Sequence, residues 1–339
     1  MEEQVQPSNA RRRKRKKPKK KRAFKIILGI ILVLILGVAG YAYSIWHSVE
    51  KTFTQTHEPL KRDVSEKRSN KVSLENGDPI SILLLGVDQR AGDRGRSDST
   101  ILMTVNPKTQ SMKMVSIPRD TRTEIVGKGT QDKINHAYAF GGVDMAVNTV
   151  EKFLDVPVDY YVQVNMESFK DIVDAVGGVT VNNNLAFNYD GYSFQKGPLK
   201  LDGKEALAFT RMRKQDPRGD FGRQQRQRQV IEGVIDEGAS VQSLTNYGTI
   251  LDAIGQNVKT NLTFDDMKQI QSNYKDARKN SEQLQINGKG EKINGIYYYA
   301  VSDDTRNQLS TELKKFKSKI KNFRILNCLS KTDIKRRHP

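Results

Sequence analysis

Residues 80–87 read ISILLLGV, a nearly continuous apolar run that follows a long polar stretch. A run of this kind is expected for a β-strand that is buried on both faces. Downstream of it, strand-like and helix-like patterns alternate along the chain. We therefore predict an α/β class domain, a layered α/β/α arrangement with a mixed central sheet.

The other predicted elements follow from period, caps and turn residues. Gly141-Gly142 should interrupt the first long helix, and Thr263 with Asp266 has the spacing of a capping box. The segment 182–197 is rich in Asn, Gly and Tyr and is predicted to be a loop. The predicted strands are 100–105, 112–117, 158–164, 179–181 and 296–301, and the predicted helices are 133–154, 166–176, a turn at 202–208, a segment after 263, and 305–320.

Upstream of the domain, residues 26–46 carry no charge and are rich in Ile, Leu and Val. About 20 apolar residues span a bilayer as a helix, and the Lys and Arg residues just before the run favour a cytoplasmic N-terminus. A cleaved signal peptide is the alternative, but its apolar core is shorter, about 7–15 residues. We therefore predict one transmembrane signal-anchor helix in the cell membrane, with the rest of the chain outside the cytoplasm.

The charge of the chain is unevenly distributed. Of the formal +18, residues 1–25 contribute twelve Lys/Arg and two Glu, a net +10. This basic tail is interpreted as a topology signal with affinity for anionic lipid, and no nucleic acid partner is expected. Residues 47–79 are predicted to be an extracytoplasmic linker, 80–320 the folded domain, and 321–339 a second basic tail of unknown role. Cys328 is the single cysteine, so a disulfide within one chain is excluded.

Residues 211–230, RMRKQDPRGDFGRQQRQRQV, concentrate six arginines. The first part is predicted to be extended, and a helix is expected to start with Asp220 as its N-cap. Counting back from Val230 at helical spacing places Arg223 and Gln227 on the face that becomes apolar further along. A buried guanidinium needs an anionic partner, so an anion is expected among these side chains. A solvated basic helix with internal ion pairs is the alternative.

Further polar residues lie at the ends of the predicted strands. Asp88 ends the first strand and Asp98 precedes the second, so the two carboxylates can share one Mg²⁺; local turn hydrogen bonds are the alternative. Arg119 follows another apolar strand and should project from the same sheet edge as Asp88. An Arg119–Asp120 surface pair is the alternative there.

The sequence lacks the motifs of the common nucleophilic and zinc enzymes. It contains no P-loop, no zinc motif and no G-x-S-x-G, and His136 is interpreted as structural. The tyrosines at 297–299 are interpreted as strand packing rather than a ligand platform. Candidate metal carboxylates with convergent arginines and no protein nucleophile are typical of phosphoryl transfer by positioning and charge neutralisation. Outside the cytoplasm, a lipid-linked phosphate or pyrophosphate is the expected donor.

Several long motifs, in this order along 80–320, resemble the LytR-CpsA-Psr family of Gram-positive cell-wall enzymes. They are LLLGVD with RSDST, MVSIPRDT, KINHAYAFGG, FKDIVDAVGGV, LDGKEALAFTRMR and DFGRQQRQRQV. A short basic tail, one membrane span and an outer domain also match the family's layout. The ending at 321–339 does not resemble the family's usual ending.

The resemblance implies a Mg²⁺-dependent glycopolymer phosphotransferase. Such an enzyme moves an anionic cell-wall polymer, such as wall teichoic acid, from a polyprenyl-pyrophosphate carrier to a sugar hydroxyl of peptidoglycan, forming a phosphodiester. By motif match, Asp88 and Asp98 would bind Mg²⁺ and, with Arg119, form the catalytic set. The residues expected to hold the pyrophosphate are Arg96, Arg119, Arg211, Arg213, Arg223 and Gln227. The alternatives are a lipid-pyrophosphate hydrolase and a membrane-bound transcriptional attenuator that binds DNA through residues 11–25.

Overall fold

The computed structural model of the chain describes residues 43, 47, 56–88, 95–165, 169–238, 253, 255 and 258–318. The chain divides into two compact units, Met1–Ser48 and Val49–Pro339, and the fold below belongs to the second. Within the described residues, no helix is both long enough and apolar enough to cross a bilayer. The predicted span at 26–46, apart from Tyr43, and the tail at 321–339 lie outside the described residues.

The centre of the domain is a six-stranded mixed sheet in the order β11-β6-β1-β2-β3-β12. β1 lies in its interior, antiparallel to β2 and parallel to β6, and β2 is antiparallel to β3. The bounds are β1 Ile80–Asp88, β2 Arg96–Asn106, β3 Ser111–Ser116, β6 Tyr160–Asn165, β11 Val258–Thr260 and β12 Ser281–Gln285. The predicted mixed central sheet is confirmed. The apolar run at residues 80–87 forms β1, which has a neighbouring strand on each side.

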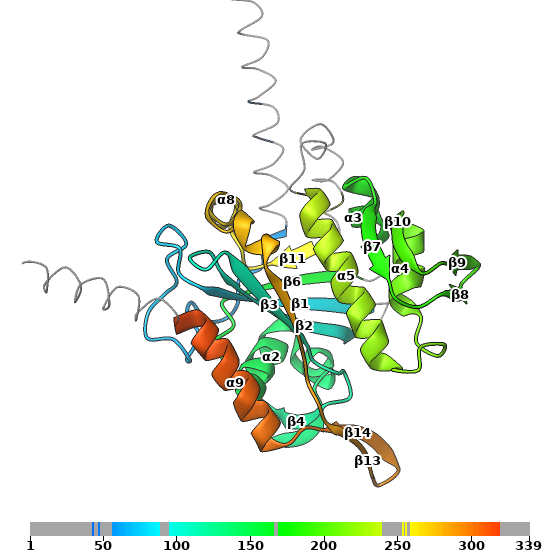
Figure 1. Ribbon diagram of the computed structural model, residues 1–339. Coiled ribbons are helices and arrows are strands. Elements are labelled where there is room, and N and C mark those ends of the chain that lie inside the picture. Colours follow the sequence, from blue (N-terminus) through cyan, green and yellow to red (C-terminus); the bar gives the residue numbers. More distant parts are fainter. Residues whose placement is uncertain are drawn as a thin grey trace, which may run out of the picture. The chain divides into compact units, whose positions relative to one another are not determined.

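Helices cover both faces of this sheet (Figure 1). Helix α2 (His136–Leu154) and helix α9 (Asp303–Ser318) pack on the face that carries Leu83 and Leu85. Helix α5 (Asp220–Gly238) and helix α8 (Phe264–Asn273) pack on the opposite face. The predicted α/β/α layering is therefore confirmed, because alternate residues of one strand supply two separate cores.

A second, smaller core lies on the outer side of α5. It joins α5 to helix α3 (Phe169–Ala175) and helix α4 (Gly203–Arg211), and the rings of Phe187, Phe194 and Phe209 contact one another at its centre. Its strands are β7 Val179–Asn183 paired with β10 Gly197–Leu201, and β8 Phe187–Tyr189 paired with β9 Tyr192–Phe194. This core packs against the side of α5 that faces away from the central sheet, so the helix is packed on two sides.

The prediction of a loop at 182–197 is wrong. The segment contains the β8–β9 hairpin, which turns at Asp190 and Gly191, where φ is 53° and 81°. Two central residues with positive φ are the requirement of the tight hairpin turn that Asp-Gly favours. The Asp-Gly pair between two aromatic stretches was the signal for this hairpin.

The expected interruption of the first long helix is confirmed. Gly141 and Gly142 leave helical geometry inside α2, and φ of Gly142 is 67°. The capping box of α8 is also confirmed, with Thr263 accepting from the backbone N–H of Asp266.

The expectation that ordered structure begins at Ile80 is wrong. Leu74 is buried in the core beneath α8, and Arg62 forms an ion pair with Glu151 of α2. Arg68 donates a 2.6 Å hydrogen bond to Asp159. Residues 56–79 read as a polar linker because their partners lie about 90 residues away in the chain, where local pattern carries no information.

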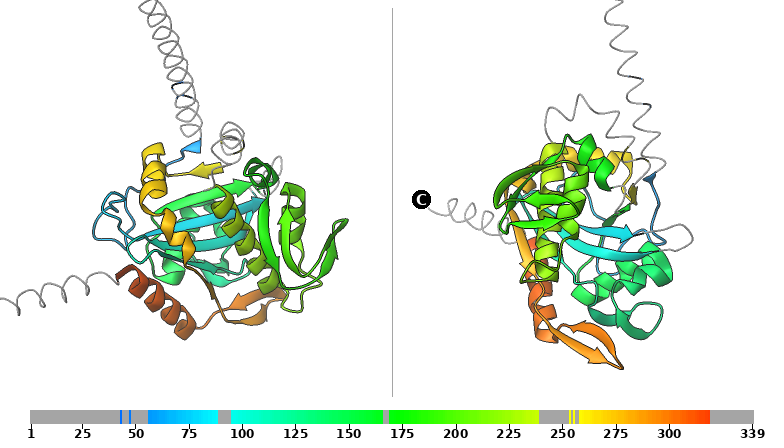
Figure 2. Two further views of the ribbon diagram at one scale, coloured as in Figure 1. Left: turned by 45° about the horizontal axis from the view of Figure 1, so that its top comes forward. Right: turned by 90° about the vertical axis from the view of Figure 1, so that its right-hand side faces the viewer.

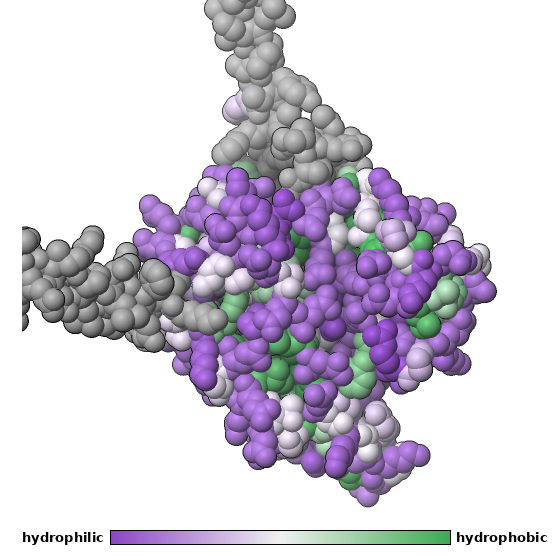
Figure 3. Space-filling model, in the orientation of Figure 1, coloured by the Kyte–Doolittle hydropathy of each residue, from purple (hydrophilic) through white to green (hydrophobic). Residues whose placement is uncertain are grey.

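Two further hairpins follow the neighbouring parallel strands β3 and β12 in the chain. One pairs β4 (Arg122–Ile125) with β5 (Thr130–Lys133), and the other pairs β13 (Lys289–Ile293) with β14 (Ile296–Ala300). The strand expected at 296–301 is thus present, but it pairs in a hairpin and not in the central sheet. The face of the molecule drawn in Figure 3 is largely hydrophilic, with smaller hydrophobic patches scattered over it.

Candidate functional site

Two parallel strands end at the same edge of the sheet, and polar residues gather there. β1 and β3 are both antiparallel to β2, so Asp88 at the end of β1 and Arg119 just after β3 lie at one edge, as predicted. Nη1 of Arg119 lies 3.0 Å from Oδ1 of Asp98. Asp98 stands in β2 beside an irregularity in the β1–β2 register. The fold therefore joins Asp98 and Arg119, which are 21 residues apart.

Arg119 also has a second carboxylate close by. Its Nε lies 3.5 Å from Oδ2 of Asp120, and Oδ1 of Asp120 accepts from Nζ of Lys133 at 2.7 Å. Burial lowers the pKa of Arg119, but the charges of Asp98 and Asp120 outweigh burial and raise the pKa above its ordinary value. Arg119 is therefore a fixed cation held in place by two carboxylates.

The first turns of α5 bring a second arginine to this position. Nη2 of Arg223 lies 2.7 Å from Oδ1 of Asp220, and Nε of Arg213 lies 3.9 Å from the same oxygen. Burial lowers the pKa of Arg223; Asp220 acts in the opposite direction, and the charge of Arg119 adds to the lowering. Only 13% of the Arg223 side chain is exposed. Arg223 is thus a largely buried cation whose pKa is lowered mainly by burial, with the carboxylates Asp220 and Asp98 and the guanidinium groups of Arg119 and Arg213 around it.

The hydrogen bonds of Arg223 are incomplete. Its Nε is buried and meets no acceptor among the described residues. A buried donor left without an acceptor costs roughly 1–3 kcal/mol, so such groups normally have a partner. Four cationic side chains pair with three carboxylates at this position. The cations are Arg119, Arg213, Arg223 and Lys133, and the carboxylates are Asp98, Asp120 and Asp220. An anion with several oxygens, such as a phosphate, would complete this set, because a guanidinium binds such groups through two parallel hydrogen bonds.

One turn further along α5, an apolar cavity begins. Gln227 is buried and its Oε1 accepts a 3.1 Å hydrogen bond from Ser99 of β2. Gln227 and Ser99 line a cavity of about 420 Å³ between the sheet and helices α3, α5 and α8. Most of its other lining residues are apolar, among them Ile101, Met103, Val162, Val164, Phe169, Ile172, Ile231, Val234, Ile235 and Met267. A volume of this size lies within the range of cavities that hold small ligands.

The remaining predicted site residues surround this centre. Asp88 ends β1 opposite Arg96, which is the first residue of β2 and is exposed. Arg211 is half-buried and follows Thr210, which lines the cavity. The prediction that Arg211 begins an extended segment is wrong: it is the last residue of α4. That helix starts at a capping box of Asp202 and Glu205 and ends at Arg211, because ψ of Met212 is 132° and leaves helical geometry.

Asp220 is not placed as predicted either. It is the first residue of α5 and not the residue before it. Its carboxylate forms an ion pair with Arg223 and accepts a hydrogen bond from the side chain of Gln224. Asp220 therefore orients the pyrophosphate candidate Arg223, in addition to lying where a helix favours negative charge.

Two arginines of the stretch 211–230, Arg226 and Arg228, have a structural role. The sequence alone did not distinguish them from the candidate site arginines. Arg226 donates to Asp216 at 2.7 Å and to the carbonyl of Met212 at 2.6 Å. Arg228 donates to Oγ of Ser116 at 2.6 Å, and burial lowers its pKa to about 10. For Arg226 the expected anion is thus an internal one. Asp216 within the stretch was the only local signal of this pairing.

The oxygen ligands at the sheet edge suit a hard divalent cation. Mg²⁺ is commonly held by one or two carboxylates together with substrate phosphate oxygens. Asp88 and Asp98 supply two carboxylates on neighbouring strands. Among the described residues, no three His, Cys, Asp or Glu side chains form a metal cluster by themselves. A cation here would therefore depend on the substrate for its other ligands.

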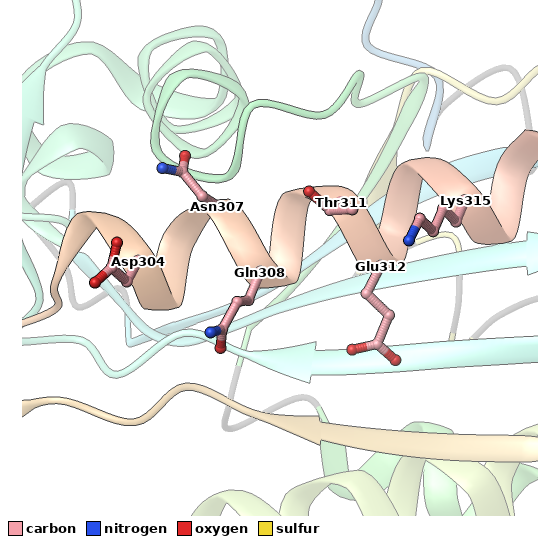
Figure 4. A pocket seen from close by; sticks show the side chains of 6 residues that line it. All are labelled: Asp304, Asn307, Gln308, Thr311, Glu312 and Lys315. Carbon is pink, nitrogen blue, oxygen red and sulfur yellow. The ribbon is translucent and has the colours of Figure 1, made fainter.

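A separate hollow lies on α9 and does not share these properties. Figure 4 shows its six side chains spread along a single helix instead of converging on one point. They are Asp304, Asn307, Gln308, Thr311, Glu312 and Lys315. None of them belongs to the sheet edge or to the apolar cavity, so the hollow is not part of the candidate site.

Comparison with known proteins shows which family and which solved structures this chain is similar to. The model of the LytR_cpsA_psr family matches residues 43–315. A Bacillus subtilis protein named polyisoprenyl-teichoic acid–peptidoglycan teichoic acid transferase TagU is 59% identical over 288 residues, covering 85% of this chain and 94% of that protein. The crystal structure of B. subtilis TagU has a TM-score of 0.59 at 57% identity, over 70% of this chain and 96% of the other. A structure described as TagT bound to LIIa-WTA has a TM-score of 0.66 at 37% identity, over 76% and 98%.

Proposed function

This chain belongs to the LytR_cpsA_psr family, and from that membership we propose that it transfers wall teichoic acid from a polyprenyl-pyrophosphate carrier to peptidoglycan. The relatives named TagU are called polyisoprenyl-teichoic acid–peptidoglycan teichoic acid transferases, and TagT is described as bound to LIIa-WTA. The high identity over most of the chain extends the activity to this protein.

One observation supports the proposal more than any other. The incompletely paired Arg223 and the fixed cation Arg119 lie next to an apolar cavity, with Gln227 at the junction. A ligand that fits both parts has an anionic head and an apolar tail. A polyprenyl pyrophosphate has this composition: the pyrophosphate would lie among the arginines and the first part of the chain would fill the cavity.

The reaction we propose is a direct displacement at phosphorus. The oxygen of the acceptor hydroxyl forms a bond to the phosphorus that carries the glycopolymer, and the bond from that phosphorus to the bridging oxygen breaks, so that polyprenyl phosphate leaves. The proton of the hydroxyl passes to solvent water. Arg119, Arg213 and Arg223 hold the phosphate oxygens and neutralise the charge that develops on them. Asp98 and Asp220 keep Arg119 and Arg223 in place.

Mg²⁺ would be held by Asp88 and Asp98. When bound, it would supply further charge neutralisation at the pyrophosphate. The chemistry of these two carboxylates supports this assignment, since both are oxygen ligands at the edge where the substrate phosphates would lie.

The location of the protein is part of the same proposal. Residues 26–46 would cross the membrane once, with residues 1–25 in the cytoplasm and the transferase domain outside, as in Gram-positive bacteria. The uncharged apolar run and the basic residues before it support this topology. A lipid-linked donor is then available at the membrane surface next to the domain.

The test uses the full-length chain in detergent. It is incubated with a synthetic polyprenyl-pyrophosphoryl disaccharide, Mg²⁺ and peptidoglycan oligomers, and the products are followed by mass spectrometry. A glycan joined to the oligomer through a phosphodiester is the expected product. Release of polyprenyl phosphate without transfer would indicate a hydrolase. Absence of both turnover and lipid binding would favour the attenuator.

A large side chain placed in the cavity should weaken binding of the donor's polyprenyl tail and leave binding of its pyrophosphate head unchanged. Ile231→Trp should raise the KM for a long-chain donor about 100-fold, because excluding about four methylene groups from the cavity loses roughly 3 kcal/mol. A donor with a single isoprene unit, too short to reach Ile231, should be affected much less. The measurement is the transfer rate as a function of donor concentration for both donors.

The control for this prediction is Ile231→Met, which changes shape but conserves volume. It should behave like the wild type with both donors. Equal losses for long and short donors in the Trp variant would place the tail elsewhere.

Removing one candidate metal ligand should change the Mg²⁺ requirement. Asp98→Asn should raise the Mg²⁺ concentration needed for half-maximal transfer by at least about tenfold, because it removes one of two carboxylate ligands. The measurement is a Mg²⁺ titration of the transfer rate. Asp120→Asn is the matched control, since Asp120 also contacts Arg119 but is assigned no metal. An unchanged titration for Asp98→Asn would remove Asp98 from the metal site.

A further inference from the structure

The β13–β14 hairpin starts beside the arginine cluster, which consists of Arg119, Arg213 and Arg223, and extends away from it. The backbone N–H of Tyr299 donates a 2.8 Å hydrogen bond to the carbonyl of Asp120, the residue that follows Arg119. From there the two strands project from the domain, at the end away from α8 (Figure 1 and Figure 2). The base of the hairpin is therefore fixed to the site, and its tip is free of the central sheet.

One face of this hairpin is made of tyrosine rings lying over glycines. Tyr297 and Tyr299 point to the same face, because side chains alternate along a strand. A methyl group added at Gly290 would lie 2.8 Å from Cε2 of Tyr297, and one added at Gly288 would lie 2.8 Å from Cε1 of Tyr299. The absence of side chains at these glycines lets both rings lie close to the partner backbone.

The two rings differ in what covers them. Tyr299 is buried: its hydroxyl donates to the carbonyl of Ile286 at 3.1 Å, and its ring meets the edge of Phe221 at 5.9 Å. Tyr297 is 45% exposed. Lys292, directly opposite Tyr297 in the hairpin, is also exposed. The predicted role in strand packing thus holds for Tyr299, but Tyr297 presents a large aromatic surface to solvent.

We infer that Tyr297 is a platform on which a sugar ring of the acceptor glycan, the peptidoglycan strand, stacks. The inference rests on the proposed function and adds the place where its acceptor binds. An aromatic ring offers an apolar face to the C–H face of a sugar, and it does so with few rotatable bonds. Lys292 beside it supplies hydrogen-bond donors for sugar oxygens or for carboxylates on the strand.

The position of the hairpin assigns it to the acceptor and not to the donor. Along α5, Phe221 touches the hairpin, Arg223 belongs to the arginine cluster, and Ile231 and Ile235 line the cavity. The cluster therefore lies between the hairpin and the cavity. In phosphoryl transfer, the attacking and leaving oxygens are roughly in line on opposite sides of the phosphorus. The leaving polyprenyl phosphate lies on the cavity side, so the acceptor hydroxyl arrives from the hairpin side.

The spacing is suitable for a glycan that reaches the reacting phosphorus. Tyr297 is two residues beyond Tyr299, about 7 Å along the strand. A sugar stacked on Tyr297 would thus place the next part of the strand over the base of the hairpin, next to Asp120 and Arg119. Successive sugars of one chain can occupy these two positions.

The test compares three variants of the full-length chain in detergent. Tyr297→Ala should raise the KM for peptidoglycan oligomers about tenfold, which corresponds to the loss of one aromatic contact. Tyr297→Phe should retain the wild-type value, because stacking needs the ring and not the hydroxyl. Ile296→Ala is the matched control, since Ile296 is 51% exposed on the other face of the same hairpin. A second measurement, co-sedimentation with insoluble peptidoglycan stripped of teichoic acid, reports acceptor binding without catalysis and should show the same order.

The outcomes separate the inference from the proposed function. If the wild type transfers and Tyr297→Ala keeps the wild-type KM for the acceptor and the same co-sedimentation, the platform is wrong and the transferase stands. A rise in the KM for the lipid-linked donor, with that for the acceptor unchanged, would assign the hairpin to the donor glycan and also overturn the inference. If the wild type shows no transfer, the proposed function fails, and only co-sedimentation then decides on Tyr297.

Discussion

Replacement of Arg119 by alanine is expected to lower the rate of transfer about a thousandfold while the protein stays folded. A preorganised group that neutralises developing charge contributes about 10²–10³ to the rate in other enzymes, and Arg119 carries a full charge. Two carboxylates hold its guanidinium, so its position costs no reorganisation during the reaction. About a third of the side chain is exposed, so its ion pairs add only roughly 0–1 kcal/mol to stability. The measurement is kcat for transfer, together with the thermal unfolding temperature.

Arg122→Ala is the matched control for this variant. Arg122 lies three residues further along in β4 and is exposed, so its loss removes the same charge from the same part of the chain. It should keep a rate close to that of the wild type. If Arg119→Ala retained the wild-type rate, or if both variants lost the same amount, Arg119 would have no specific role in charge neutralisation.

The inner strands β1 and β2 were predictable from the sequence because they are buried on both faces, whereas the short edge strand β11 and the largely exposed edge strand β12 were not predicted. The apolar runs that became β1, β2 and β3 need no information from distant residues, since an apolar run of strand length has few other solutions. The kink in α2 and the cap of α8 were predictable for a similar reason, because glycine pairs and capping boxes act within four residues.

Contacts over long distances explain what the sequence did not show. The linker at 56–79 joins the fold through Arg62 and Arg68, whose carboxylate partners Glu151 and Asp159 lie about 90 residues away. No local period reveals such a pair. The β8–β9 hairpin is a different case: the Asp190-Gly191 turn was visible, but its short strands pack against α4 and not into the central sheet.

In the stretch 211–230, helical spacing predicts which arginines are buried, but it does not predict which of them have a partner within the protein. Helical spacing placed Arg223 and Gln227 inward, and the structure buries both. The same spacing does not distinguish Arg223 from Arg226, since both are buried on one helix. What differs is the partner: Arg226 has Asp216 and two backbone carbonyls, whereas Nε of Arg223 has no acceptor among the described residues. Only the structure separates the arginine that holds the fold together from the one available to a ligand.

That distinction predicts a large loss of stability from a residue outside the site. Asp216→Asn should lower the free energy of unfolding by about 3 kcal/mol, the lower end of the cost of breaking a buried ion pair by removing one partner. The Asp216 side chain is fully buried, and it accepts from Arg226 at 2.7 Å and from Arg218 at 3.1 Å. Asparagine keeps the shape, which matters because Gly222 leaves no spare room: a methyl group there would lie 1.7 Å from Oδ2 of Asp216. The measurement is urea unfolding at neutral pH.

Unfolding measured at lower pH should show whether the loss of stability in Asp216→Asn comes from the loss of the Asp216 charge. Burial raises the pKa of this carboxyl group, but hydrogen bonds from Arg218 and Arg226 outweigh burial and lower the pKa to about 2, from an ordinary 3.8. Because the folded-state pKa is the lower one, the stabilisation is complete above about pH 4 and is lost as the pH falls towards 2. The difference between the wild type and Asp216→Asn should therefore shrink over that range. Asp236→Asn is the control, since Asp236 pairs with Arg278 at 2.6 Å on the surface and should cost roughly 0–1 kcal/mol at neutral pH. A similar small loss for Asp216→Asn would mean that the backbone carbonyls alone are sufficient to hold Arg226, and that the ion pair does not fix the helix carrying Arg223.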